Sequence, residues 1–454
     1  MILLSLALMA AAVAWTLIQI ARKKMHPLGL PTLAAGSFAF LYVWQPAYLL
    51  ATGKLHYFLS EAQIVKGVLT AFVMYIVFHW GWFYGGKGRL VAKNMRWDYR
   101  RLYHRGLLLG LLGMGLFLIF LRQSGGAVTY YSAVHGAAGA WQQQTAWVYM
   151  GKKLIFPALV MMIIARQRAR LGRTAWFMVV VLGGLIFADG FLMGSRGILF
   201  PWAVTIGMTA YLTSGIHPRV GRVFLAGLAV GLAVLLLVGY RSELRLGGDL
   251  SKVSLREALL ATSEINEAHL SAQTTGIEFV YHSGMIDAID ETKTYNLGVN
   301  WLYMTTIHLI PRLLWPNKPY GWSLASVNLS KVTGLNIAGG AAYGLVADFY
   351  REFGQASVFL WFLLGYYSRR LFRMATEQRT PGTILVYVLW YAWGLHLFAQ
   401  GFGALLIPYL YTLVPGALLA LSCRRRITTV LSTPVMSPTG GIVQVSPHLG
   451  WRAR

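Results

Sequence analysis

Positively charged side chains on stiff segments are the clearest candidates for chemistry in this chain. Arg312 and Lys318 lie in Ile310–Trp322, a segment that also contains three prolines and two tryptophans. A charge that only kept a loop soluble would not need such rigidity, whereas a guanidinium or ammonium group held in place binds phosphate oxygens well. The sequence therefore predicts that both residues bind an anionic substrate.

Two further arginine sites could bind an anion, and each has a structural alternative. Arg196 follows Asp189 across a glycine-containing turn, where the amides of Gly194–Gly197 could face an anion at the start of a helix. The alternative is an ion pair between Asp189 and Arg196. Arg241 and Arg245, four residues apart, would share one helix face. Their alternative role is to reach from an apolar span to the membrane surface.

His396 and Gln400 are also four residues apart, on one face of an aromatic, apolar segment. A histidine in such a helix more often packs or donates a hydrogen bond than reacts, so both readings stay open. The chain has no HExxH or paired DxD motif and no histidine–carboxylate cluster, and it has no Walker-type glycine loop. We therefore expect neither a metal nor another cofactor, and phosphate charge would fall to arginine and lysine.

The elements that must position these residues are membrane-spanning helices. Apolar residues make up 56% of the 454 residues, charged residues only 12%, and the mean hydropathy is +0.54. The net charge of +25 does not indicate nucleic acid, because the basic residues form short clusters between apolar runs. The single cysteine, Cys423, excludes a disulfide framework. Since no basic residue precedes Ile2–Ile20, we expect a retained first span there and no cleaved signal.

The hydropathy pattern predicts an all-α polytopic membrane protein with about eleven transmembrane helices, because about 20 apolar residues cross a bilayer. The predicted spans are 2–20, 28–51, 62–84, 106–121, 152–165, 175–193, 198–214, 223–240, 355–368, 382–400 and 404–422. They define four parts: helices 1 to 8 in 1–240, a large loop in 241–354, helices 9 to 11 in 355–426, and a disordered tail in 427–454.

The basic residues predict the orientation, because short cytoplasmic loops are rich in lysine and arginine. Most of the 40 basic residues fall in alternate connections, which hold only two of the 15 acidic residues, Asp98 and Glu377. We therefore place these connections and the carboxyl terminus in the cytoplasm. The amino terminus and the 241–354 loop then lie outside the cytoplasm, on the periplasmic side.

Two substantial outer loops carry many polar and aromatic side chains. The 241–354 loop holds eleven of the 15 acidic residues, and Ser254–Ala272 and Gly276–Ile289 have the spacing of amphipathic helices, which we expect to rest on the membrane face. The other loop, 122–151, contains Tyr130 and Tyr131 among amides. Such residues suit sugar stacking, although an aromatic belt at the membrane interface would use the same residues.

The order of three motifs resembles that of the Wzy-type polymerases, which join oligosaccharide repeat units of O-antigens. The motifs are the turn Gly194–Gly197, the element Pro-Arg-x-x-x-Pro-x-Lys-Pro of 311–319, and Tyr343–Gly354 before a late span. The last resembles a family pattern of Gly-Glu, an aromatic residue and Phe-Gly. Here Ala347-Asp348 stands in place of Gly-Glu, so the acid is kept but is shorter.

The resemblance implies an enzyme of the bacterial inner membrane. It would transfer a growing glycan from undecaprenyl pyrophosphate to a lipid-linked repeat unit in lipopolysaccharide or exopolysaccharide synthesis, without a metal. Its partners would be lipid-linked oligosaccharide, membrane lipids and a chain-length regulator protein. Such a reaction needs a general base and positive charge for the leaving diphosphate. The residues assigned to these roles are, for diphosphate or substrate, Arg196, Arg241, Arg245, Arg312 and Lys318; for catalysis, Asp348, with Glu352 and His396 in reserve; for sugar stacking, Tyr130, Tyr131 and Trp315.

Asp348 is the first candidate base because it lies just before a predicted span, where a partly desolvated carboxylate would have a raised pKa. The competing explanation is a structural ion pair with Arg351. Three other functions stay open: an O-antigen ligase-type glycosyltransferase, a flippase for lipid-linked oligosaccharides, and a non-catalytic lipid-binding assembly factor. Two features disfavour a transporter. The polar residues are concentrated in one loop, and the sequence shows no interrupted helices at matching positions of two repeated halves.

Overall fold

The structure is a computed structural model and describes residues 1–88, 96–127, 130, 146–193, 196–214, 277–307, 310, 314–315, 317 and 343–425. Within them, nine helical segments are long and apolar enough to cross a membrane. These segments are α1 (Ile2–Ala21), α2–η1–α3 (Leu30–Phe38, Ala39–Trp44, Gln45–Ala51), α5 (Glu61–Gly85), α6 (Tyr99–Gln123), α9–η2–α10 (Ala146–Gly151, Lys152–Leu154, Ile155–Ala169), α11 (Arg173–Leu192), α12 (Arg196–Ser214), α20–α21 (Pro381–Ala392, Gly394–Gln400) and α22 (Phe402–Leu421). They coincide with nine of the eleven predicted spans and confirm a polytopic, helical architecture.

The two other predicted spans differ from these nine. Residues 223–240 lie outside the described part of the chain. The span predicted at 355–368 corresponds to α19 (Ser357–Arg373), which has 17 residues and ends in arginines. It packs so closely against α5 that a Cβ atom at Gly81 or Gly365 would clash with the backbone of the other helix. Glycine therefore permits this close packing.

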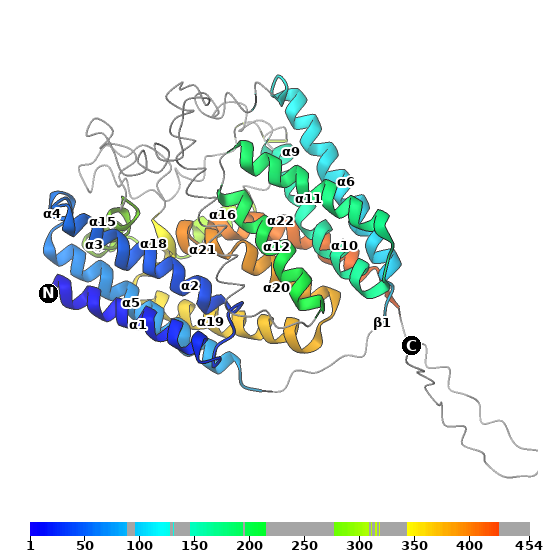
Figure 1. Cartoon of the computed structure of the whole chain (residues 1–454). Coiled ribbons are helices and arrows are strands. Elements are labelled where there is room, and N and C mark those ends of the chain that lie inside the picture. Colours follow the sequence, from blue (N-terminus) through cyan, green and yellow to red (C-terminus); the bar gives the residue numbers. More distant parts are fainter. Residues whose placement is uncertain are drawn as a thin grey trace, which may run out of the picture.

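The remaining elements are short. They are α4 (Leu55–Phe58), α15 (Ile277–Thr292), α16 (Val299–Thr305), α18 (Gly344–Phe353), η6 (Gly354–Ala356), η7 (Met374–Gln378), β1 (Arg96–Trp97) and β2 (Arg424–Arg425). The two strands pair antiparallel, with Arg96 opposite Arg425, and so join the start of α6 to the end of α22. Figure 1 shows the amino terminus, α4 and α15 on one side of the molecule and β1 on the other.

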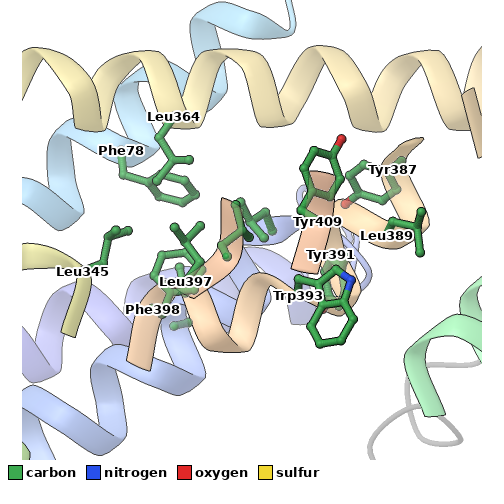
Figure 2. Packing of buried hydrophobic residues seen from close by; sticks show 14 of the residues in the cluster. Phe78, Leu345, Leu364, Tyr387, Leu389, Tyr391, Trp393, Leu397, Phe398 and Tyr409 are labelled. Carbon is green, nitrogen blue, oxygen red and sulfur yellow. The ribbon is translucent and has the colours of Figure 1, made fainter. Parts of the chain in front are cut away.

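The core runs between the helices as one large apolar cluster. Figure 2 shows Phe78 of α5 beside Leu364 of α19, with Leu397 and Phe398 of α21 nearby. Trp393 interrupts the helix between α20 and α21 and is almost wholly buried. The α20–α21 segment is therefore an internal element, with neighbours on both sides.

Basic side chains gather at one end of the bundle, which we call the basic end. Contacts establish that these segments meet: Arg373 of α19 donates to the carbonyl groups of Gly86 and Gly88 after α5, and His26 after α1 bonds to Tyr211 near the end of α12. The described basic residues of this end are Arg22, Lys23, Lys24, Lys87, Arg96, Arg100, Arg101, Arg105, Arg166, Arg168, Arg170, Arg173, Arg369, Arg370, Arg373, Arg379, Arg424 and Arg425. They are the residues that predicted a cytoplasmic side; the orientation itself stays a prediction.

The helix predicted at Gly276–Ile289 exists, as α15, but the expectation that it rests on the membrane face is wrong. Residues on all sides of it are buried, including Phe279, Val280 and Ala288, because α15 packs between α5 and α18. Its burial was hidden in the sequence, since a short helix with mixed polar residues resembles an interfacial one. Ser254–Ala272 lies outside the described residues.

Candidate active site

Asp348 of α18 is buried at the opposite end of the bundle, and both of its carboxylate oxygens accept hydrogen bonds. Arg351 donates from Nη2 to Oδ1 at 2.7 Å. Oδ2 accepts from Nε1 of Trp301 at 3.1 Å and from the backbone amide of Phe402 at 2.8 Å. The ion pair with Arg351 that competed with a catalytic role is therefore present.

Glu352, the next acid on α18, is bound in the same manner. Its Oε1 accepts from Nη2 of Arg351 at 3.2 Å and from Nδ2 of Asn296 at 3.4 Å, and its Oε2 accepts from the amide of Gly298 at 3.0 Å. Gly298 has φ of +83°, a conformation that glycine adopts easily. Glu352 thus holds the turn between α15 and α16. We call Asp348, Arg351 and Glu352 the α18 charge cluster.

Burial and charge pairing act in opposite directions on the pKa values of this cluster. Burial raises the pKa of Asp348 and of Glu352, although the guanidinium of Arg351 acts to lower both. Burial also acts to lower the pKa of Arg351, but the two carboxylates outweigh it and keep that pKa above its usual range. Nη1 of Arg351 donates to the hydroxyl of Tyr343 at 3.1 Å, and burial raises the pKa of Tyr343 to about 12. The single positive charge of Arg351 therefore compensates only part of the negative charge that the two buried carboxylates can carry.

The α18 charge cluster also fixes the turn between α21 and α22. Gly401 in that turn has φ of +103°, and a Cβ atom there would lie 2.9 Å from Cβ of Asp348. The carboxylate of Asp348 caps the next amide, that of Phe402. Because Gln400 immediately precedes this turn, Asp348 helps to position the last residues of α21.

A cavity of about 430 Å³ lies between α2–η1, α20–α21 and the first residues of α12 and α15. Its walls are mainly apolar, with Leu33, Phe40, Leu41, Tyr391 and Leu395 among them. The polar side chains that line it are Thr32, Ser37, Glu278, His396 and Gln400. A carboxylate, an imidazole, two hydroxyls and an amide thus face one largely apolar space, which is a usual composition for a ligand site.

The polar groups of the cavity keep free bonding capacity. Oε2 of Glu278 accepts from Nε2 of Gln45 at 2.8 Å, whereas its Oε1 has no hydrogen-bond partner among the described residues. The same holds for Oγ of Ser37, which is 8% exposed, and for Nδ1 of His396. Buried polar atoms are normally bonded, so unpaired ones around a cavity indicate space for a polar ligand.

The structure brings together some of the residues predicted from sequence. His396 and Gln400 both line the cavity. Arg196 begins α12, and the adjacent Gly197 lines the cavity; the Arg196 side chain is outside the described part. Trp315 is described and 39% exposed. Outside the described residues lie Arg241, Arg245, Arg312, Lys318 and Tyr131.

Tyr130 occupies a different environment from the one expected for a sugar platform. Its ring is fully buried and makes edge contacts with Phe117 and Phe120. Its hydroxyl accepts from Nζ of Lys152, which also pairs with Asp189 at 2.7 Å. Tyr130 would have to leave this cluster to stack on a sugar, and Lys152 is one partner of Asp189.

Sequence reasoning missed Glu278, Gln45 and Ser37. Gln45 and Glu278 are 233 residues apart, and neither belongs to a recognisable motif. The one available signal in the sequence was Gln45 itself, an amide inside an apolar span. In the structure this residue is only 1% exposed. Such a residue needs a buried partner, but the sequence does not say which.

Neither a metal centre nor a relative helps to identify the site. Within the described ranges, no group of three or more histidine, cysteine, aspartate or glutamate side chains could hold a metal ion. Comparisons with models of protein families, with curated proteins and with solved structures found no match for this chain.

Proposed function

We propose that this chain is a glycan polymerase of the inner membrane that transfers a growing glycan from a polyprenyl diphosphate to a lipid-linked repeat unit. The observation that carries the proposal is the cavity, in which apolar walls inside a membrane bundle meet Glu278 and His396. An amphiphilic substrate needs both kinds of surface. The resemblance to Wzy-type polymerases adds the reaction class.

The start of α12 is the proposed place for the diphosphate. Its first residues reach the cavity at Gly197, and a helix amino terminus with Arg196 on it favours a negative charge. The unpaired Oγ of Ser37 in the same cavity gives an independent sign of a missing polar partner. Arg241, Arg312 and Lys318 stay as predicted additional cations on the loop.

The α18 charge cluster stabilises two turns that adjoin helices of this site. It fixes the α21–α22 turn through Asp348 and the α15–α16 turn through Glu352. These turns adjoin the helices that carry His396 and Glu278. In this proposal the geometry of the cavity depends on the cluster, while the transfer itself occurs among the groups that line the cavity.

The test is to reconstitute the purified chain in liposomes with an undecaprenyl diphosphate-linked repeat unit, without nucleotide and with a chelator. We expect a ladder of longer, still lipid-attached glycans. Transfer only to a different acceptor would indicate a ligase-type enzyme. Movement of the substrate across the vesicle without bond formation would indicate a flippase, and either result would overturn the polymerase assignment.

The proposal also requires the cavity end of the bundle to face away from the cytoplasm. Lys293→Cys, in a Cys423→Ser background, should react with a membrane-impermeant thiol reagent added to the periplasmic side, because Lys293 is exposed after α15. Arg168→Cys, exposed at the basic end, is the matched control and should be protected. The reverse pattern would invert the orientation.

A further inference from the structure

We propose that Glu278 is the general base of this site, accepting the proton of the attacking sugar hydroxyl. The inference rests on the proposed function and assigns the step to a residue that no motif indicates. Three features of Glu278 support it: the way its carboxylate is held, the bonding capacity it keeps, and the charges around it.

The carboxylate of Glu278 is held in a fixed position by one buried amide. Nε2 of Gln45 donates to Oε2 of Glu278 at 2.8 Å, and Oε1 of Gln45 accepts from the backbone amide of Phe279 at 3.0 Å. Gln45 therefore binds both the side chain and the backbone at the start of α15. A base must be within hydrogen-bond reach of its proton donor, and such a clamp fixes that distance.

Glu278, which is half-buried, differs from the buried acids Asp348 and Glu352 in its unused lone pairs. Asp348 and Glu352 accept hydrogen bonds on both oxygens. Glu278 uses Oε2 only, and its carboxylate lines the cavity, where Oγ of Ser37 is also unpaired. Asp348 and Glu352 each accept at least three hydrogen bonds, whereas Glu278 accepts one from the described residues, so Glu278 keeps more acceptor sites for a substrate proton.

Among the residues that the structure describes, no cation is paired with Glu278. His282, one turn further along α15, faces Tyr42 and the carbonyl of Gly67, and burial lowers its pKa to about 4, so it is neutral. The other titratable groups of the cavity are His396 of α21 and Tyr391 of α20.

The step is balanced without a further reactant. The acceptor hydroxyl oxygen attacks the anomeric carbon of the donor glycan while its proton passes to Oε1 of Glu278. The bond from that carbon to the diphosphate oxygen breaks, and the electron pair leaves with the lipid diphosphate. The proton on Glu278 is then released to water, which restores the carboxylate.

The deciding variant is Glu278→Gln, because glutamine can keep the bond to Gln45 but cannot take a proton. We expect elongation in the liposome assay to fall at least ~100-fold, with unchanged binding of the lipid-linked repeat unit in native mass spectrometry. Asp287→Asn is the matched control on the same helix. Its carboxylate faces Lys66 and Gln63 instead of the cavity, so elongation should stay close to that of the unsubstituted chain.

The two proposals fail in different ways. If the unsubstituted chain makes no longer glycan, the polymerase function is wrong. If it does, and Glu278→Gln elongates within about threefold of it, only the role of Glu278 is overturned. Should Glu278→Gln not fold, Glu278→Asp decides, since it keeps the charge but withdraws the carboxylate by one methylene. A tenfold or larger loss, about 1.4 kcal/mol, supports a base, and normal elongation contradicts it.

Discussion

The α18 charge cluster and the cavity beside it contain similar residue types but use them differently. In the cluster, every oxygen of Asp348 and Glu352 accepts a hydrogen bond, and Arg351 forms an ion pair with each acid. In the cavity, Oγ of Ser37 and Nδ1 of His396 have no partner among the described residues, and Glu278 accepts a hydrogen bond on Oε2 alone from them. Polar side chains whose atoms are all hydrogen-bonded within the protein indicate a structural role. Polar side chains with unbonded atoms around a cavity indicate ligand binding or catalysis. Variants in the two regions should therefore affect different measurements.

The largest loss of stability is expected for Arg351→Met. It leaves two buried carboxylates without their cation, and breaking a buried pair in this way costs about 3–5 kcal/mol. Thermal unfolding in detergent should show a much lower melting temperature and a poor yield of folded protein. Arg370→Met, on an exposed arginine of α19, is the control and should melt normally. A normal melting temperature for Arg351→Met would mean that the cluster is not structural.

A smaller loss of stability is expected for Asp348→Asn. An asparagine has one acceptor oxygen in place of two, so it cannot accept the hydrogen bonds of Trp301, Phe402 and Arg351 together. We expect this loss to cost about 1–3 kcal/mol. Elongation by the folded fraction should fall no more than about tenfold. Near-complete loss of elongation, with normal melting and substrate binding, would instead support Asp348 as the proton acceptor.

On the cavity side, His396→Asn should change activity more than stability. Nδ1 of His396 has no hydrogen-bond partner in the part of the chain that the structure describes, so its replacement should cost about 1 kcal/mol of stability or less. Elongation should fall about tenfold, through loss of a polar contact with the substrate. His104→Asn, on an exposed histidine at the basic end, should change neither quantity. Equal losses of stability for His396→Asn and Asp348→Asn would break the contrast between the two regions.

The smallest effect concerns pH and a carboxylate that is paired but partly exposed. Partial burial acts to raise the pKa of Asp290, but hydrogen bonds from Lys66 and Tyr350 outweigh it and lower the pKa below its usual range. The stability from Asp290 is therefore present above its unfolded pKa and is lost as pH falls through the lower folded pKa. Melting temperatures measured from pH 7 down to 3 should decline less in Asp290→Asn; identical curves would contradict this.

Much of the fold could be predicted from hydropathy, because each span carries its own signal of length and apolar composition. Leu30–Ala51 and Phe402–Leu421 are examples that needed no information from elsewhere in the chain. The depth of α15 could not be predicted in this way. Its burial depends on α5 and α18, and a helix whose partners are distant in sequence shows no periodic sign of them.

The site was only partly predictable, for the same reason. His396 and Gln400 were found because their spacing is local. Asp348 was found through a motif, but its hydrogen-bond donors Trp301 and Phe402 come from segments 47 and 54 residues away. The sequence does not show that these donors bind its carboxylate. Glu278 was one acid among eleven in a long loop until Gln45 and the cavity set it apart.

The six residues of η1 form a π-helix, whose hydrogen bonds span five residues instead of four. This wider turn accommodates an extra residue, so the helix faces before and after η1 are out of step. Deleting one residue from η1 would restore α-helical spacing and rotate the following helix by about 100°. Gln45, the first residue after η1, would then turn away from Glu278. The length of this one segment therefore decides whether Gln45 can reach Glu278.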